Sequence, residues 1–168
     1  MISAATYFER KVSNQIDFDL GTFTYGNLAK VRAEGVELEL KLRPAEGFTV
    51  DANYTYTKST NRQRGDANFG NDLARRPRNS VNVAADYAWA FGLRTGATIT
   101  HVSNSFDDAG NNRRLQGYVL VDLRAAYPVS DNIELFGRIE NLFDERYETA
   151  FQYSQERRTA SVGVRLNY

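Results

Sequence analysis

The feature that most constrains the fold of this chain is an alternation of apolar and polar residues that recurs along almost its whole length. In one stretch the apolar positions are Val36, Leu38, Leu40 and Leu42. The residues between them are charged. A period of two is typical of a β-strand with one apolar and one polar face, because successive side chains of a strand point to opposite sides. Helical periodicity is hard to find anywhere in the sequence.

The same alternation predicts about eight strands, each long enough to cross a bilayer, which requires about 9–11 residues. These strands are expected near residues 2–19, 36–43, 48–56, 81–89, 93–100, 119–127, 133–140 and 161–168. We therefore expect an all-β protein, an antiparallel transmembrane β-barrel in which neighbours in sequence are paired. The positions expected to face lipid are Leu38, Leu40, Val83, Tyr87, Val121, Leu123, Val162, Val164 and Leu166. In the first strand, Ile16 and Phe18 are expected on one face.

The polar faces of the expected strands carry charges of both signs, which suits a barrel lumen lined by ion pairs. The carboxylates on these faces are Glu37, Glu39, Glu134 and Glu140, and the cations that could balance them are Lys41, Arg43, Arg124, Arg138 and Arg165. Thr98 and Ser161 should face the same lumen. We find no nucleophile beside a base and no phosphate-binding glycine loop, so we expect no enzymatic activity.

The connections between the expected strands alternate between short and long. Short ones lie near residues 44–47, 88–92 and 128–132, and longer ones near 21–30, 61–74, 107–115 and 149–155. Outer-membrane barrels have short periplasmic turns and longer extracellular loops. This order predicts that the C-terminus lies in the periplasm and that the long loops lie outside the cell.

Aromatic residues beside the short turns support the same orientation. They are Phe48, Trp89, Phe91, Tyr127 and Tyr168. Aromatic rings with an apolar body and a polar edge favour the membrane–water interface. We expect these five to form a ring at the periplasmic interface.

Composition excludes several classes of function. The chain has 21 basic and 21 acidic residues, no cysteine and one histidine, His101. The absence of a basic excess argues against nucleic-acid binding. A single histidine without cysteine cannot form a usual zinc site. The oxygen-rich segment 107–112 lacks the spacing of a calcium loop, and we interpret it as a solvated turn. We expect no metal and no cofactor.

The sequence also lacks an export signal and an apolar stretch long enough for a transmembrane helix. Residues 1–5 have neither a basic region nor an apolar core of the kind found in signal peptides. Since a barrel of the outer membrane must be exported, we interpret the sequence as mature-like or as a fragment.

The last residues combine alternation with a terminal aromatic. Ser161, Gly163, Leu166 and Tyr168 give the spacing polar–x–Gly–x–x–apolar–x–aromatic. This pattern resembles the C-terminal signal by which the outer-membrane insertion machinery recognises barrel proteins. An extended edge strand with an apolar alternate face suits recognition by strand addition. The insertion machinery is therefore an expected partner, together with outer-membrane lipid.

A second motif lies just before the last strand, at Asn141, Leu142, Phe143, Asp144 and Tyr147. It resembles the penultimate-strand motif of TonB-dependent receptors, and residues 32–37 and 126–129 are similar to that family as well. Residues 147–153 are similar to its cobalamin receptors. The resemblance implies a 22-stranded barrel with an N-terminal plug domain, driven by the TonB complex. No plug is found in this sequence, so the expected domain is residues 1–168, the C-terminal part of a larger barrel.

The function implied by the resemblance is transport of a scarce nutrient, such as cobalamin or a ferric siderophore, across the outer membrane of a Gram-negative bacterium. The TonB complex would act only through the missing plug domain. The loop residues that could contact a small-molecule ligand are Arg62, Arg64, Phe69, Arg113 and Tyr153.

Two alternatives remain open at this point. A self-contained eight-stranded barrel with a structural or adhesive role would also suit the pattern, because eight strands can close around a lumen filled with side chains. A soluble sandwich is disfavoured, since leucine, valine and tyrosine would be exposed to water on nearly every strand.

Overall fold

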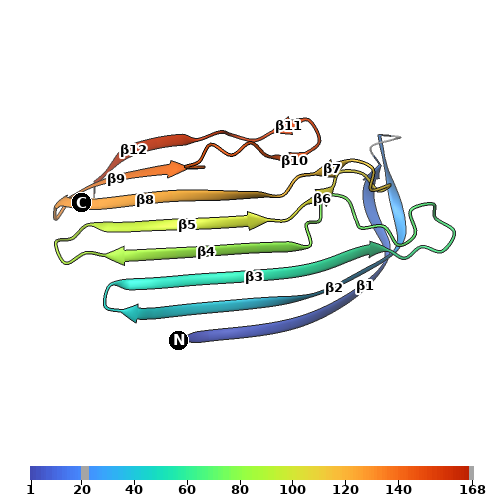
Figure 1. Ribbon diagram of the computed structural model, residues 1–168, viewed down its shortest axis with the longest axis horizontal. Coiled ribbons are helices and arrows are strands. Elements are labelled where there is room, and N and C mark those ends of the chain that lie inside the picture. The colour runs from blue at the N-terminus through green and yellow to red at the C-terminus, as the bar shows by residue number, and fades with distance from the viewer. Residues whose placement is uncertain (20–22, 167–168) are drawn as a thin grey trace.

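The chain forms one long antiparallel sheet with the strands in sequence order (Figure 1). The computed structural model describes residues 1–19 and 23–166. The eight strands of the sheet are β1 (Ile2–Asp19), β2 (Thr24–Ala45), β3 (Phe48–Asn61), β4 (Asn79–Ala88), β5 (Arg94–Val102), β8 (Tyr118–Ser130), β9 (Ile133–Glu140) and β12 (Thr159–Leu166). This confirms the predicted all-β fold and the pairing of neighbours.

Two small hairpins lie outside the main sheet, in the long connections. One joins β6 (Ser105–Phe106) to β7 (Arg114–Leu115), and the other joins β10 (Glu148–Ala150) to β11 (Tyr153–Ser154). In Figure 1 both lie toward the end of the sheet that is opposite the start of β1 and the end of β12. The short turns lie at the end where β1 starts, as the alternation of short and long connections predicted.

Strand register separates the two faces as the sequence pattern predicted. Residues directly opposite one another on five successive strands form one apolar row, made of Leu40, Ala52, Val83, Ile99 and Val121. A row on the other face is made of Thr49, Asp86, Gly96, Arg124, Arg138 and Ser161. All nine positions expected to face lipid share the apolar face, while Thr98 and Ser161 lie on the polar face.

The apolar face is exposed, because the sheet is a single layer. Among the described residues, the buried hydrophobic side chains are only Val31, Leu73 and Leu115, and none of them belongs to the apolar row. Large apolar side chains such as Leu123, Leu135 and Val164 remain exposed on that face. An apolar surface of this extent is unfavourable in water and suits the hydrocarbon of a bilayer.

The outermost strands of the sheet are β1 and β12. Over residues 1–19 and 23–166, no pairing joins these two strands, so the sheet does not close on itself. The alternative of a self-contained eight-stranded barrel is therefore not what this structure shows. The sheet has the form of a barrel wall with two free edges, which lipid cannot satisfy.

Aromatic side chains gather beside the short turns. The rings of Phe48 and Tyr87 lie 6.1 Å apart, those of Tyr87 and Trp89 lie 4.8 Å apart, and those of Trp89 and Phe91 lie 5.9 Å apart. Tyr127 is exposed at the same end of the sheet. The expected aromatic ring is thus present at this level, except for Tyr168, which lies outside the described residues.

The segment 149–155 lies in a long connection, as predicted, and contains the β10–β11 hairpin. Two other expectations were wrong. The predicted loop at 21–30 is largely strand, because β2 begins at Thr24 and pairs with β1 as far as Asp19 opposite Thr24. Asp107, expected in a solvated turn, is buried. The predicted orientation of Phe18 concerns a side chain outside the described ones.

Among the described residues, no helix is long and apolar enough to cross a membrane.

Candidate functional site

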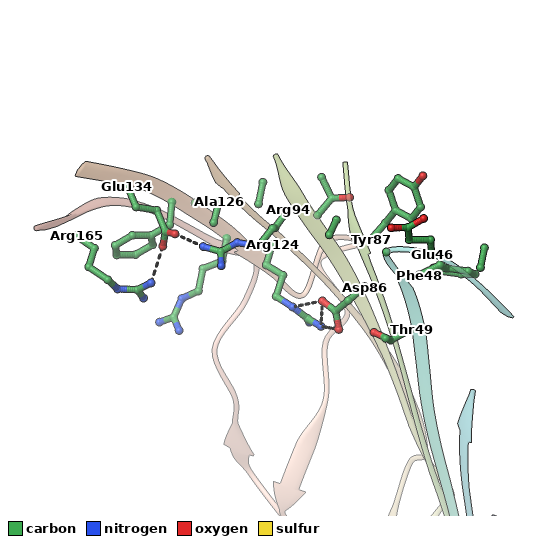
Figure 2. A pocket seen from close by; sticks show the side chains of 18 of the residues that line it. Glu46, Phe48, Thr49, Asp86, Tyr87, Arg94, Arg124, Ala126, Glu134 and Arg165 are labelled. Atoms are coloured by element: carbon green, nitrogen blue, oxygen red, sulfur yellow. Dashed lines mark hydrogen bonds and ion pairs between the residues drawn. The ribbon is translucent and has the colours of Figure 1, made fainter. Parts of the chain in front are cut away.

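The polar face carries an ion-pair network near the short turns, where Glu134 on β9 is shared by two arginines. Arg165 on β12 donates from its guanidinium to Oε1 of Glu134 at 2.5 Å. Arg94 on β5 donates to Oε2 of the same carboxylate, reaching over β8 to do so. Figure 2 shows the carboxylate of Glu134 between the two guanidinium groups. Glu134 is 9% exposed, so this carboxylate is a buried charge of the sheet.

A second ion pair crosses one strand in the same way. Arg124 on β8 donates to Asp86 on β4, with its Nε 3.0 Å from Oδ1. Gly96 lies on β5 between them, and a Cβ there would come within 2.6 Å of Nε of Arg124. A glycine at this position leaves the space through which the arginine reaches. Arg124 also donates to Oγ1 of Thr98 at 2.8 Å, so these side chains form the polar lining that the sequence predicted.

The residues of the C-terminal signal divide between the two faces. Ser161 accepts a hydrogen bond from Nε of Arg138 at 3.2 Å on the polar face, and Leu166 is exposed on the apolar face. Gly163 lies opposite Phe136, and a Cβ there would lie 2.9 Å from Cε1 of the ring and closer still to Cζ. Gly163 therefore has a packing role beside Phe136. Tyr168 lies outside the described residues.

The ion-paired side chains of the polar face, together with Arg138 and Ser161, line a hollow of about 1290 Å³ (Figure 2). Five arginines line it, Arg43, Arg94, Arg124, Arg138 and Arg165. The carboxylates in its lining are Glu46, Asp86 and Glu134. The excess of arginine gives this end of the face a positive character, which attracts anions.

The family motif at residues 141–147 forms a tight turn after β9. Asn141 is buried in the left-handed conformation, at φ +53°, which asparagine tolerates better than most residues. Its side chain accepts from the N–H of Glu145 at 2.8 Å and donates to the carbonyl of Glu145 at 2.9 Å. Its own N–H donates to Asp122 on β8 at 2.8 Å. Asn141 thus shapes this turn and anchors it to the sheet.

Asp144, also left-handed at φ +59°, links this turn to the start of β12. It accepts from Nε of Arg157 at 2.7 Å and from the N–H of Arg158 at 3.1 Å. The hydrogen bond from Arg157 is the main cause that lowers the pKa of Asp144 to about 2, with the N–H of Arg158 second. In the same motif Tyr147 packs against Tyr118, with ring centroids 4.3 Å apart, and Phe143 is exposed. The contacts of Asn141, Asp144 and Tyr147 are thus structural.

Three long connections lie at the other end of the sheet. We name them loop 1 (62–78), loop 2 (103–117) and loop 3 (141–158). The residues expected to contact a ligand are exposed on them: Arg62, Arg64 and Phe69 on loop 1, Arg113 on loop 2 and Tyr153 on loop 3.

Within the described residues, no hydrogen bond, ion pair or ring contact joins any two of these five side chains. The guanidinium of Arg113 lies 5.3 Å from the ring centroid of Phe151, two residues before Tyr153. Loops 1 and 2 are nevertheless tied, since the side chain of Asn71 donates to the carbonyl of Ala109 at 3.0 Å.

The sequence analysis missed Asp107. Its carboxylate is 2% exposed and accepts from Nε of Arg75 at 2.7 Å and from the N–H of Phe151 at 3.2 Å. It therefore belongs to a contact among all three loops. An aspartate in a polar segment gives no signal of such burial, because its partners lie in other loops.

No metal site is indicated by the geometry. Among the described residues there is no group of three or more His, Asp or Glu side chains placed to hold a metal ion. His101 lies on the apolar face, between Val81 and Val119 of the neighbouring strands.

The single-layer sheet, its two opposed faces and its alternating turns and loops define the class of protein: a wall segment of an outer-membrane β-barrel. Residues 2–142 match the family described as TonB dependent receptor-like, beta-barrel. The chain belongs to this family.

Its relatives include receptors with different ligands in their names. The probable TonB-dependent siderophore receptor PiuA of Acinetobacter baumannii is 26% identical over 99% of this chain and 24% of its own length. The vitamin B12 transporter BtuB of Photobacterium profundum is 31% identical over 79% of this chain and 21% of its own length. The heme/hemopexin utilization protein C of Haemophilus influenzae is 35% identical over 76% of this chain and 18% of its own length.

The fold agrees with these similarities. The crystal structure of the siderophore receptor PiuA from Acinetobacter baumannii superimposes with a TM-score of 0.82 over 99% of this chain and 26% of that receptor. The chain therefore spans about a quarter of the length of such relatives. TonB-dependent receptors are outer-membrane transporters of Gram-negative bacteria and not enzymes, so the predicted location and family are confirmed.

Proposed function

We propose that this barrel wall serves a receptor that takes up a scarce nutrient through the outer membrane, and that loops 1 to 3 form part of its ligand-binding surface. Membership of the TonB-dependent receptor family is the observation that carries this proposal. The exposed loops and the arginine-lined hollow at the other end of the polar face are consistent with a passage between them. Binding and passage require no bond breaking, in agreement with the lack of catalytic residues in the sequence.

The ligand that the loops favour is an anionic metal chelate, such as a ferric siderophore. Loop 1 contains five arginines and two aspartates, Asp66 and Asp72. Both aspartates are already engaged: Asp66 accepts from the N–H of Asn68 at 2.7 Å, and Asp72 from the guanidinium of Arg78 at 3.0 Å. Free positive charge therefore remains on this loop.

The cations left on loop 1 are Arg62, Arg64 and Arg76, which are exposed and have no side-chain partner within the described residues. Guanidinium groups recognise carboxylate and other oxyanions through paired hydrogen bonds. We assign Arg62 and Arg64 to ligand contact on this ground. Phe69, Arg113 and Tyr153 would add flat apolar area and donors for a large polar ligand.

Cobalamin is the second candidate. It is favoured by the similarity of residues 147–153 to cobalamin receptors and by the 31% identity to a vitamin B12 transporter. The charge of loop 1 favours cobalamin less, because a ligand with little negative charge would not pair with the three exposed arginines.

The further partners that we propose follow from the family. The TonB complex would drive uptake through a plug domain, and the outer-membrane insertion machinery would recognise Ser161, Gly163, Leu166 and Tyr168. Lipid would cover the apolar face.

Uptake by cells tests the proposal. The full-length protein is expressed in a strain that lacks its own siderophore and cobalamin receptors, and uptake of radiolabelled ferric chelates and of cobalamin is compared with and without TonB. We expect TonB-dependent uptake of an anionic ferric chelate, reduced by the double variant Arg62→Gln/Arg64→Gln at equal abundance in the outer membrane. Uptake of cobalamin alone, unchanged in that variant, would reject the anionic class.

A further inference from the structure

Asp107 is the most deeply buried charged side chain among the described residues that the barrel-wall function leaves unexplained. It lies on loop 2, directly after β6, with 2% of its surface exposed. A buried carboxylate is unfavourable unless it is paired and hydrogen-bonded, because its charge has lost the solvation of water. Its partners therefore show what the burial stabilises.

Those partners come from the two other loops. Arg75 of loop 1 donates from Nε to Oδ1 of Asp107 at 2.7 Å, and the N–H of Phe151 in loop 3 donates to the same oxygen at 3.2 Å. A backbone hydrogen bond also joins these segments, because the N–H of Arg75 donates to the carbonyl of Phe106 at 2.6 Å. One carboxylate oxygen thus holds loops 1 and 3 against loop 2.

Other contacts support this junction. The N–H of Asp72 donates to the side-chain oxygen of Asn111 at 2.9 Å, and the side-chain nitrogen of Asn111 donates to the carbonyl of Asp72 at 2.9 Å. Leu73 of loop 1 and Leu115 of loop 2 are also buried. Loops 1 and 2 are therefore joined by polar pairs in addition to the contact at Asp107.

Each loop also holds one residue in the left-handed conformation at or next to this junction. These are Arg75 at φ +55°, Asn111 at φ +56° and Gln152 at φ +66°. Arginine and glutamine adopt this conformation only when the surroundings determine it, and such residues concentrate at functional sites. The contacts of Asp107 hold Arg75 in this conformation, and they hold Phe151, the residue before Gln152.

We propose that Asp107 is a positioning residue that fastens the three loops into one preorganised ligand-binding surface; this inference rests on the proposed receptor function. Asp107 acts on the ligand contacts through the backbone. Its own N–H donates to the carbonyl of Arg113 at 2.8 Å, and its carboxylate holds Phe151, over which the guanidinium of Arg113 lies.

The benefit of such a fastening is entropic. Three independent loops would each lose conformational freedom when a ligand bound, and this loss would weaken affinity. Loops that are already tied lose less. A ligand that contacts Arg64 on loop 1 and Tyr153 on loop 3 would then meet both residues in their bound arrangement.

Hydrogen exchange on the full-length protein in outer-membrane vesicles tests the coupling without any ligand. We compare Asp107→Asn with Asp108→Asn. The second is a matched control, because among the described residues the carboxylate of Asp108 accepts only from its own loop, including the N–H groups of Asn112 and Arg113 at 3.0 and 2.7 Å. Asp107→Asn should raise exchange by about tenfold in residues 71–78, 103–117 and 148–155, as expected for loss of a charge-assisted hydrogen bond. Asp108→Asn should raise exchange in loop 2 alone.

A rise confined to loop 2 in Asp107→Asn, or no rise, would overturn the fastening. A second arm measures the affinity of the same variants for the radiolabelled ferric chelates used in the uptake experiment. Weaker binding by Asp107→Asn than by Asp108→Asn is expected, and equal binding after loosening of all three loops would overturn the positioning role. If the wild-type protein binds no chelate, the proposed receptor function fails, while the exchange result still decides whether the loops are coupled.

Discussion

The two ends of the sheet hold their charged side chains in different ways. Near the short turns, Arg94 pairs with Glu134 across 40 residues of sequence, and Arg124 pairs with Asp86 across 38. In the loops, Asp107 pairs with Arg75 across 32 residues and with Phe151 across 44. The separations are similar, so distance in sequence is not what distinguishes the two ends.

The difference is what selects the partner. On the sheet, strand register brings the partners to neighbouring positions of one face, and small residues such as Gly96 leave room for an arginine to cross a strand. The hairpins β6–β7 and β10–β11 have a register within their own loops, but individual hydrogen bonds between the loops decide which loops meet. Burial does not separate the two ends, because Glu134 of the wall and Asp107 of loop 2 are both buried, while Asp86 is about half exposed. Strand register therefore determines the pairs of the wall, and specific contacts between segments determine the arrangement of the loops.

The largest effect that would sharpen this contrast concerns the two faces of β5. Ile99 and Thr98 are neighbours in sequence but point to the apolar and the polar face. Ile99→Arg should lower the free energy of unfolding by about 2–4 kcal/mol, the cost of an arginine at mid-depth in lipid. Thr98→Arg should cost less, because Asp122 lies directly opposite on β8. Urea unfolding of the full-length protein in lipid vesicles measures both, and equal costs would contradict the assignment of the faces.

The shared carboxylate of the wall should matter more than the exposed pair beside it. Glu134→Gln removes the charge that two arginines share, and we expect a loss of about 1–2 kcal/mol in the free energy of unfolding. Asp86→Asn should cost below about 1 kcal/mol, since both members of that pair are well exposed. The same unfolding measurement applies, and a larger effect at Asp86 would show that burial does not rank these pairs.

A smaller effect is expected at Gly163. An added methyl group meets the ring of Phe136, so Gly163→Ala should cost about 1 kcal/mol, at the low end of overpacking because the ring is partly exposed and can move. In a Phe136→Ala background the same substitution should cost nothing. A double-mutant cycle with no coupling between the two positions would show that Gly163 serves only the insertion signal.

The smallest effect is a pH dependence in loop 3. The pKa of Asp144, about 2, lies below the ordinary value of about 3.9. Its stabilising contribution is therefore complete above about pH 4 and is lost as the pH falls through about 2. Hydrogen exchange at the N–H of Arg158, corrected for intrinsic rate, should rise between pH 4 and pH 2. Asp144→Asn should remove this dependence, and an identical rise in that variant would refute the assignment.

Most of the wall could be predicted from the sequence, because a residue period of two indicates both where the strands lie and which side chains share a face. The alternation predicts Leu40, Val83 and Val121 on one face, and the strand register confirms this. The start of β2 was not predicted, because Gly26 and Asn27 are typical of loops. Over residues 24–28 the pairing of β2 with β1 overrides local propensity.

Less of the candidate site could be predicted. The sequence contains the recognisable family motif, but it does not indicate what the motif residues do. The hydrogen bonds of Asn141 and Asp144 show that these two residues shape a turn. The ligand contacts proposed at Arg62, Arg64 and Tyr153 still rest on residue type and exposure. The burial of Asp107 was not predicted, because the sequence around it does not indicate that Arg75 and Phe151 are its partners.

The central claim is that the chain is a wall of an outer-membrane barrel with loops 1 to 3 outside the cell. The chain contains no cysteine, so single cysteines introduced into it can be labelled without background from these residues. A membrane-impermeant maleimide applied to intact cells should label the variants Arg64→Cys and Asn111→Cys. It should not label Glu46→Cys or Asp131→Cys until the outer membrane is permeabilised. Labelling of Glu46→Cys and Asp131→Cys, but not of Arg64→Cys and Asn111→Cys, in intact cells would contradict the account.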